Sequence, residues 1–179
     1  MAEHVRGCDA VVSCLGHNPK TIRDLYAEPR RLCTQISQMV CSTIHSIAPS
    51  RPIKYLVVST GLVDTPADPK RGHLQRLVLW LLEWFLPPHV DNLANAAFLS
   101  ALDSNPHVEF VAVRPDLLVN GDESQYAAHA TLQNGIFNAG ATSRANVGAF
   151  MAELVAVDAT WERWKGRFPH LLNVVPKCR

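Results

Sequence analysis

Apolar positions along the chain alternate between short β-branched runs and longer stretches with helical spacing. The short runs occupy residues 10–15, 53–59 and 108–113, and each predicts a buried strand. The longer stretches occupy residues 28–47, 77–86 and 91–102, together with a segment that begins at Ser143. This alternation of strands and helices is typical of an α/β domain with a parallel sheet.

Local signals set the expected ends of these elements. Asp91 or Asn92 is the expected N-cap of the helix over 91–102, and Ser143 of the helix that follows it. The strand over 108–113 is expected to stop at "RPD", because proline cannot donate a ladder hydrogen bond. Residues 117–141 read as loop and short extended pieces with two Asn-Gly turn signals. The tail "WERWKGRFPHLLNVV" closes with an apolar run that reads as a final strand.

The run "LVLWLLEWFL" over residues 77–86 is the most apolar in the chain. It falls short of the roughly 20 apolar residues that span a bilayer. It therefore predicts a buried or interface helix, or a helix that contacts a membrane surface or another subunit. No repeat, low-complexity tract or linker divides residues 1–179, which are expected to form one domain.

Composition limits the classes of partner and compartment. The formal net charge of the 179 residues is +1, so no global field would attract nucleic acid or anionic lipid. The five cysteines are odd in number and scattered, without metal-ligand spacing, which favours a reducing compartment. No hydrophobic stretch of signal-peptide length opens the chain, so the cytosol is the expected location.

The predicted strands end in "SCLGHN", "STG" and "RPDLLVNGD". Ligands of open α/β sheets bind outside the carboxyl ends of the strands, so these loops are expected to converge on one site. Ser13, Ser59 and Thr60 offer hydroxyls there. Small polar residues also end strands that bind nothing, and the spacing by itself leaves that alternative open.

The blocks "DAVVSCLG", "IKYLVVSTG", "VEFVAVRPDLL" and "TSRANVGAFM" carry a resemblance in their order and spacing. Over residues 5–175 the chain resembles the atypical short-chain dehydrogenase/reductase group. This group includes the NmrA-like proteins and the flavin reductase also called biliverdin-IXβ reductase. The resemblance implies a Rossmann-like fold that binds NAD(P), with NADPH the more usual choice.

The resemblance also assigns roles to residues of this chain. Ser59 and Thr60 match the position where the family keeps a hydroxyl near the nicotinamide and the substrate, which makes them the candidate catalytic residues. Arg114 could pair with a phosphate or carboxylate, or fix a loop by bonding backbone carbonyls. The other implied cofactor neighbours are Ser13, Cys14, Leu15, Gly16, Pro115, Asp116, Leu117 and Leu118.

The chain departs from the family pattern in two places. The family's glycine-rich phosphate turn is absent, and the first strand resembles the fourth strand of the family. The first three strands of the family and their helices, on the order of 60 to 80 residues, then have no counterpart in this chain. The Tyr-x-x-x-Lys pair of the typical enzymes is also missing, since residues 72–103 contain neither tyrosine nor lysine.

Three functions fit these observations. The first is an NAD(P)H-dependent reductase that transfers hydride to a flat acceptor such as a flavin or quinone. The second is a non-catalytic module that senses NAD(P) or binds a protein, and the third is an inactive truncated form. Partners could use the exposed sheet edge or the apolar helix over 77–86.

Several side chains outside the motifs are weaker candidates. His73 and His89 could replace the missing proton donor, although surface or capping histidines are commoner. Arg144 could reach a substrate or the Asp116 loop, and Tyr126 lies in the expected substrate-side segment over 117–141. Cys14 is expected to be a buried thiol.

Overall fold

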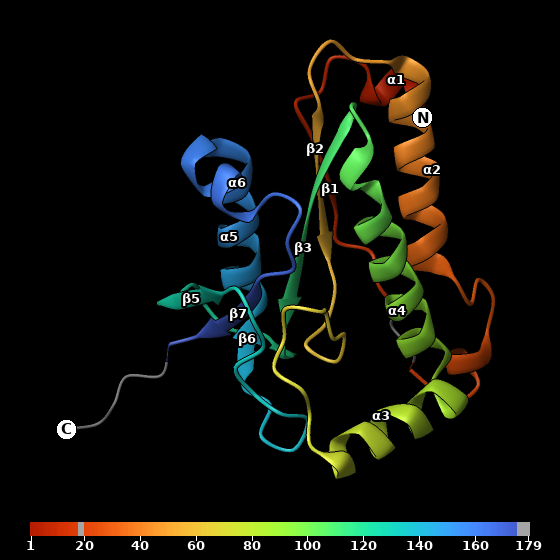
Figure 1. The fold of residues 1–179 in the computed structure, drawn as a ribbon, viewed down its shortest axis with the longest axis vertical. Coiled ribbons are helices and arrows are strands. Elements are labelled where there is room, and N and C mark those ends of the chain that lie inside the picture. Colours follow the sequence, from red (N-terminus) through yellow and green to blue (C-terminus); the bar gives the residue numbers. More distant parts are fainter. Residues whose placement is uncertain (18–19, 175–179) are drawn as a thin grey trace.

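A five-stranded sheet with the order β1-β2-β3-β7-β5 forms the centre of the protein (Figure 1). The computed structural model describes residues 1–17 and 20–174, without the side chains of residues 103 and 104. β1, β2, β3 and β7 are parallel, and β5 is antiparallel to β7, so the predicted α/β class with a parallel sheet is confirmed. The strands are β1 Ala10–Ser13, β2 Ile53–Val58, β3 Val108–Pro115, β5 Tyr126–His129 and β7 His170–Asn173. β4 Leu117–Val119 and β6 Ala141–Ser143 form a separate parallel pair.

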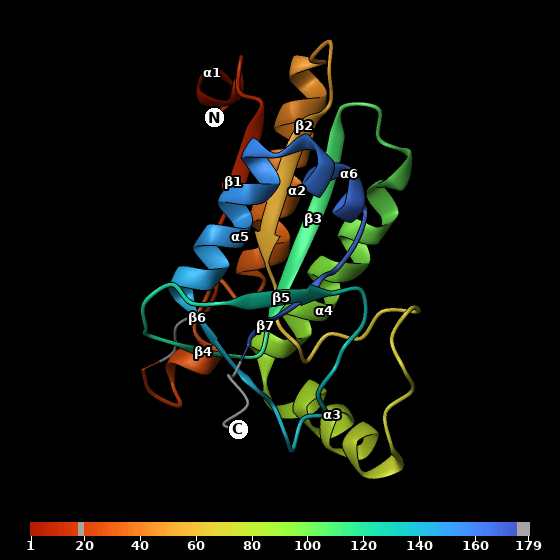
Figure 2. The ribbon, with the colours of Figure 1, turned by 90° about the vertical axis from the view of Figure 1, so that its left-hand side faces the viewer.

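Helices cover both faces of the sheet (Figure 2). On one face lie α2 Leu32–Ile47 and α4 Pro87–Ser100, and on the other α5 Arg144–Ala156 and α6 Asp158–Trp164. Successive side chains of a strand point to opposite faces, so Tyr55 packs beneath α2 and α4 while Leu56 packs beneath α5 and α6. Burial on both faces explains the continuous apolar runs of β2 and β3. The short helices are α1 Ala2–Val5, η1 Asp24–Tyr26 and η2 Ala101–Ser104.

The strand ends differ from the prediction, by one residue at β2, which ends at Val58, and by two residues at β1 and β3. β1 ends at Ser13, because its last paired residue is Ser13 opposite Val57. Cys14 and Leu15 then leave the sheet, and Cys14 is exposed, so the prediction of a buried thiol was wrong. β3 continues through Pro115, which pairs with Leu171 and accepts a hydrogen bond from the Gly61 amide. Proline can extend the strand here because only its carbonyl is needed.

Helix starts also differ from the prediction. α4 begins at Pro87, where a missing amide proton costs nothing at the first helical positions, so neither Asp91 nor Asn92 caps it. α2 begins at Leu32 instead of residue 28. The predicted cap of α5 is confirmed, since the Ser143 hydroxyl accepts a hydrogen bond of 3.0 Å from the Asn146 amide.

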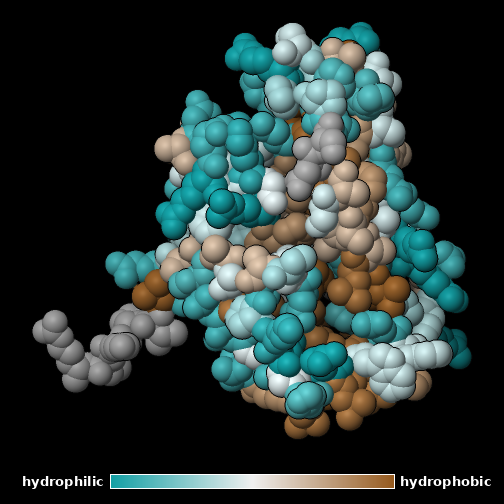
Figure 3. All heavy atoms as spheres, viewed as in Figure 1, coloured by the Kyte–Doolittle hydropathy of each residue, from teal (hydrophilic) through white to brown (hydrophobic). Residues whose placement is uncertain are grey.

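α3, residues His73–Phe85, lies at the end of the molecule toward which β1, β2 and β3 run (Figure 1). Leu79 is its buried residue, whereas Trp84 is 70% exposed and Phe85 is 65% exposed. Apolar side chains gather at this end of the surface (Figure 3). The prediction of burial was therefore wrong for most of this helix, whereas an interface with another subunit or contact with a membrane surface stays a prediction. None of the helices in the described ranges is long and apolar enough to cross a membrane.

Arg114 of β3 is fully buried and ties several segments together. Its guanidinium donates to Asp68 at 2.6 and 3.0 Å, to the Val63 carbonyl at 2.8 Å and to the Phe168 carbonyl at 2.8 Å. Asp68 also accepts from the Leu132 amide at 2.7 Å. Burial by itself raises the pKa of Asp68, but the hydrogen bonds from Arg114 and its other donors outweigh burial and lower that pKa.

Replacement of Arg114 by methionine should lower the free energy of unfolding by about 3–5 kcal/mol. The substitution leaves the Asp68 carboxylate buried without its partner charge, which is the costly half of a buried pair. Urea denaturation monitored by circular dichroism measures the change. Arg30→Ala is the control, because Arg30 forms an exposed pair with Glu28 and such pairs contribute about 0–1 kcal/mol. Equal losses in both variants would contradict the central role of Arg114.

Candidate functional site

A cavity of about 250 Å³ opens at the carboxyl ends of β2 and β3. The segment after β2, the segment after β3, the approach to α3 and the loop between β5 and β6 all contribute walls. The lining residues are Thr60, Gly61, Leu62, Arg71, Asp116, Leu117, Asn134, Gly135, Ile136 and Ala139. This is the edge of the sheet at which the sequence predicts a ligand site.

Backbone hydrogen bonds hold the two strand ends side by side. The Ser59 amide donates to the Val113 carbonyl at 2.7 Å, and the Gly61 amide donates to the Pro115 carbonyl at 2.9 Å. These bonds extend the β2–β3 ladder beyond the end of β2. At Gly61 a Cβ atom would collide with the Asp116 carboxylate, so glycine is required for the close approach of the two segments.

Asp116 lies in the cavity wall with a side chain that is 7% exposed. One carboxylate oxygen accepts from the Asn134 amide group at 2.8 Å and from the Gly140 backbone amide at 2.7 Å. The other forms a hydrogen bond of 2.9 Å with Nε2 of His170. Burial raises the pKa of Asp116, but the hydrogen bonds from His170, Asn134 and Gly140 outweigh it and lower that pKa. Asp116 is thus held as a carboxylate and can only accept hydrogen bonds.

His170 of β7 lies fully buried beside Asp116. Its Nδ1 accepts a hydrogen bond of 3.0 Å from the Gln133 backbone amide, so that nitrogen cannot carry a proton. The imidazole proton therefore sits on Nε2 and points at Asp116. The hydrogen bond between Nε2 and the carboxylate fixes the orientation of Asp116 in the cavity wall.

Arg71 brings a positive charge to the cavity. Its guanidinium donates to the Gly61 carbonyl at 2.7 Å and to Asp64 at 2.7 Å. The Arg71 side chain is 5% exposed, whereas the Asp64 side chain is 45% exposed. The cation is thus anchored next to the strand ends and close to any group that enters the cavity.

The structure separates the residues predicted at the ends of β2 and β3. Thr60 and Leu117 line the cavity. Ser59 is half-buried beside it and does not belong to its lining, Pro115 is buried, and Leu118 packs against the core beneath α5. The buried guanidinium of Arg114 bonds Asp68 and two backbone carbonyls, which is the loop-fixing alternative of its two predicted roles.

The residues predicted at the end of β1 lie outside this cavity. Ser13 is half-buried, and Cys14, Leu15 and Gly16 are exposed. Apart from its chain neighbours, no atom of the described residues lies within 4 Å of the position that a Cβ atom of Gly16 would occupy. The backbone at Gly16 is thus open on that side.

The weaker candidates lie away from the cavity lining. His73 is exposed at the start of α3, and His89 is buried with burial lowering its pKa. Arg144 donates to the Leu118 carbonyl at 3.5 Å and to Asn120 at 2.9 Å, and so contacts the segment that follows Asp116. Tyr126 donates to Glu153 at 3.0 Å, which accounts for its hydroxyl without a ligand.

Sequence reasoning missed His170, Arg71, Asn134 and Ile136. His170 lies 54 positions from Asp116, and nothing in the pattern of the last strand distinguishes it. Asn134 belongs to an Asn-Gly turn signal, which predicts a turn but no contact with Asp116. Arg71 stands in a polar loop where a solvent-exposed arginine is the ordinary expectation.

Comparison with known families identifies the chain. The model of the NAD(P)H-binding family matches residues 1–158. The chain therefore belongs to this family, and a nicotinamide dinucleotide is its class of cofactor. A search of curated protein sequences found no significant match.

Solved structures with the same fold agree with this assignment. A putative NADH-flavin reductase from Streptococcus pneumoniae has a TM-score of 0.59 and 15% identity, over 97% of this chain and 75% of its own. A short-chain dehydrogenase/reductase from Veillonella parvula in complex with NADP has a TM-score of 0.57 and 14% identity, over 98% of this chain and 67% of its own. The anaerobillin reductase ChuY from Escherichia coli O157:H7 has a TM-score of 0.58 and 14% identity, over 95% of this chain and 65% of its own. At these identities the likeness defines the fold alone, and the predicted Rossmann-like fold is confirmed.

The described residues fit a dinucleotide at the end of β1 in one respect. The open, small-residue segment over 13–16 can lie against a ribose or a flat ring. The sequence holds no glycine-rich turn of the G-x-G-x-x-G kind, so this chain offers no backbone cradle of that type for a pyrophosphate. Contact of residues 13–16 with the nucleoside part of the cofactor stays a prediction.

Acid should unfold the protein through its buried carboxylates. The pKa values of Asp68, Asp91 and Asp116 are all lowered in the folded state. Each therefore stabilises the fold above its unfolded pKa of about 4 and loses that contribution as the pH falls through its folded pKa. The free energy of unfolding from urea titrations should be flat near neutral pH and fall steeply below about pH 4.

Asp116→Asn isolates the part of this dependence that belongs to the cavity. The variant should be less stable at neutral pH. Its free energy of unfolding should also fall less steeply in acid, because it lacks one of the carboxyl groups whose pKa is lowered in the folded state. Asp158→Asn is the matched control, since Asp158 is 94% exposed. A slope unchanged by Asp116→Asn would show that His170 and Asn134 do not stabilise the charged form.

Proposed function

We propose that this chain is an NAD(P)H-dependent oxidoreductase of the atypical short-chain reductase type, which transfers hydride to a flat acceptor such as a flavin or quinone. The observation that carries the proposal is the cavity at the carboxyl ends of β2 and β3 in a chain of the NAD(P)H-binding family. Ligands of this fold bind at that edge of the sheet.

The cofactor in this proposal is NADPH, which supplies the hydride when bound. Ser13, Cys14, Leu15 and Gly16 provide the surface on the β1 side, and Leu117 provides it in the cavity wall on the β3 side. Leu118, Ser59 and Pro115 belong to the adjoining segments and do not line the cavity. The likeness of the fold to a putative NADH-flavin reductase and to a short-chain dehydrogenase/reductase in complex with NADP supports the assignment.

The acceptor in this proposal lies in the cavity between apolar walls. Leu62, Leu117 and Ile136 form a surface against which a flat ring can pack. The Thr60 hydroxyl accepts a hydrogen bond of 3.3 Å from the Leu62 amide, so its own proton is free to be donated to a carbonyl or ring nitrogen. Arg71 places a positive charge where negative charge develops on the reduced acceptor.

The cavity contains a carboxylate that cannot serve as the acid. Asp116 is held in its charged form by three donors, so it does not protonate a substrate near neutral pH. A flavin or quinone needs little help from a protein acid, because water can protonate the reduced ring. This arrangement favours such acceptors over simple ketones, which need a positioned proton donor.

A non-catalytic module that senses NAD(P) or binds a protein is the second candidate. The missing Tyr-x-x-x-Lys pair favours it, because residues 72–103 contain neither the tyrosine nor the lysine that the typical enzymes use for catalysis. We also propose that the protein is located in the cytosol. Cys8, Cys14, Cys33 and Cys41 are all free thiols among the described residues, as a reducing compartment requires.

The protein should oxidise NADPH in the presence of FMN or a soluble quinone, measured by the loss of nicotinamide absorbance. Thr60→Val should lower kcat/KM about 10- to 100-fold, since it removes a single hydrogen bond to the acceptor. Thr43→Val on α2 is the matched control, because that hydroxyl bonds the Met39 carbonyl far from the cavity.

The same measurements separate the alternatives. A thermal shift with NADPH but no oxidation of NADPH would favour the sensing module. No shift at millimolar NADPH would favour the inactive form. Turnover that is equal in wild type and Thr60→Val would remove Thr60 from the catalytic residues and leave the reductase assignment intact.

We also propose that the exposed face of α3 pairs with α3 of a second copy. Trp80 and Trp84 stack edge to face with ring centroids 6.1 Å apart, and Leu74, Leu77 and Phe85 extend the same exposed surface. Aromatic residues of this kind contribute most of the binding energy in protein interfaces. The unpaired edge of β1 is the other surface open to a partner.

Sedimentation velocity should show a concentration-dependent dimer of the wild-type protein. Trp84→Glu should shift it to the monomer, because the interface would then bury an unpaired charge. Gln38→Glu adds the same charge to an exposed position of α2 and should leave the dimer intact. A wild-type protein that stays monomeric at every concentration would contradict the pairing.

A further inference from the structure

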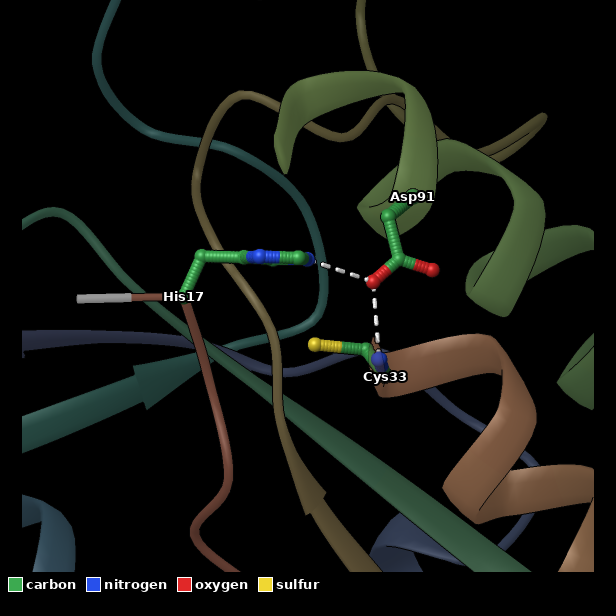
Figure 4. A group of neighbouring side chains, drawn as sticks. All are labelled: His17, Cys33 and Asp91. Atoms are coloured by element: carbon green, nitrogen blue, oxygen red, sulfur yellow. Dashed lines mark hydrogen bonds and ion pairs between the residues drawn. The ribbon is translucent and has the colours of Figure 1, made fainter. Parts of the chain in front are cut away.

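Three side chains from separate elements surround one small space beside the end of β1 (Figure 4). His17 comes from the loop after β1, Cys33 from the first turn of α2, and Asp91 from α4. The ligand atoms of the three residues all lie within 4.8 Å of one another. They offer an imidazole nitrogen, a sulfur and a carboxylate oxygen, and none of them belongs to the cavity described above.

The first turn of α2 holds the Asp91 carboxylate in place. One oxygen accepts from the Thr34 amide at 3.0 Å and from the Thr34 hydroxyl at 2.6 Å. The other accepts from the Cys33 amide at 2.7 Å. A carboxylate from α4 thus satisfies amide protons that the start of α2 leaves unpaired. Asp91 is 1% exposed, so its position is set before any ligand arrives.

Capping of α2 does not account for the other two side chains. It uses the backbone of Cys33 and Thr34, and it requires neither the Cys33 thiol nor the His17 ring. Yet Nε2 of His17 lies 2.8 Å from the second Asp91 oxygen. The Cys33 thiol, in a residue 6% exposed, makes a long hydrogen bond of 3.8 Å to the Leu15 carbonyl. The imidazole thus faces the carboxylate, and the thiol sulfur lies within 4.8 Å of both ligand atoms although capping of α2 does not involve it.

We propose that His17, Cys33 and Asp91 form a binding site for a divalent transition metal ion of the Zn²⁺ class. Sulfur and imidazole ligands select Zn²⁺ over Mg²⁺ and Ca²⁺, which require oxygen ligands. Three protein ligands leave one tetrahedral position for water. A thiolate, a carboxylate and a neutral imidazole balance the charge of the dication, so the partly buried site is neutral when filled.

Metal binding exchanges protons and changes no oxidation state. The ion replaces the proton of the Cys33 thiol, which leaves to solvent, and a zinc–sulfur bond forms. The ion also takes the place of the proton in the hydrogen bond between Nε2 of His17 and Asp91. The imidazole then carries its proton on Nδ1 instead of Nε2. The Asp91 oxygen that binds the metal keeps its bond to the Cys33 amide, because a carboxylate oxygen accepts two partners.

The site would join the segment predicted to contact the cofactor to the helical layer. Leu15 and His17 belong to the loop after β1, whereas Cys33 and Asp91 are anchored on α2 and α4. A metal ion across these elements would restrict the loop next to residues 13–16. This role does not depend on the proposed reductase activity, since a sensing module would need the same loop order.

Titration of the whole protein with Co²⁺ tests the proposal, because Co²⁺ reports its own ligands by absorption. Wild type should develop intense d–d bands of a tetrahedral ion together with a near-ultraviolet thiolate charge-transfer band, and one equivalent of Zn²⁺ should remove both. Cys33→Ser should lose the charge-transfer band. His17→Gln should weaken Zn²⁺ binding at least as much as the roughly 10- to 100-fold that loss of an outer-shell partner costs.

Matched variants keep the test decisive. Cys41→Ser removes a second buried thiol of α2 that lies outside the cluster, and Cys14→Ser removes the exposed thiol near the loop, so both should keep the band. His17 lies on a loop and its side chain is 14% exposed, so His17→Gln decides the matter if Cys33→Ser unfolds. A charge-transfer band retained in Cys33→Ser, or no thiolate band in wild type at millimolar Co²⁺, would overturn the site.

Discussion

The buried ion pair between Arg114 and Asp68 is the interaction on which the candidate site depends. Arg114 joins the end of β3 to the Val63 carbonyl after β2 and to the Phe168 carbonyl before β7. Asp68 accepts a hydrogen bond from the Leu132 amide and so ties the loop after β5 to the same ion pair. The segments after β2 and β3 and the loop after β5 lead into walls of the cavity. One pair of charges without solvent contact therefore holds these three segments together and joins them to the residues before β7.

Two other buried aspartates organise the remaining parts of this edge of the sheet. Asp116 joins the end of β3 to His170 of β7 and to the Gly140 amide, and Gly61 makes room for it. Asp91 joins α4 to the start of α2 and to His17. In all three cases amide, hydroxyl, guanidinium or imidazole donors offset the cost of burying the charge. The loops that carry the proposed chemistry are thus fixed by long-range polar bonds and little by local structure.

This construction is consistent with hydride transfer as the proposed reaction. The cavity combines apolar walls with a hydroxyl at Thr60 and a cation at Arg71, while its carboxylate is locked in the charged form. Such a site can orient a flat acceptor and stabilise charge on it. The hydride itself would come from the cofactor, so the protein contributes position and electrostatics.

The sequence by itself determined the elements whose signals are local. Alternating β-branched runs predicted β2 and the core of β3, helical spacing predicted most of α2, and Ser143 predicted its own cap of α5. Only the tertiary structure decided that Asp91 caps α2 instead of α4, that α3 is exposed, and that His170 meets Asp116 across 54 positions. Hydrophobic periodicity reports which face of an element is apolar, but it carries no information about what covers that face. Pairing of buried polar groups depends on distances between elements, which exist only once the sheet and its helices are packed.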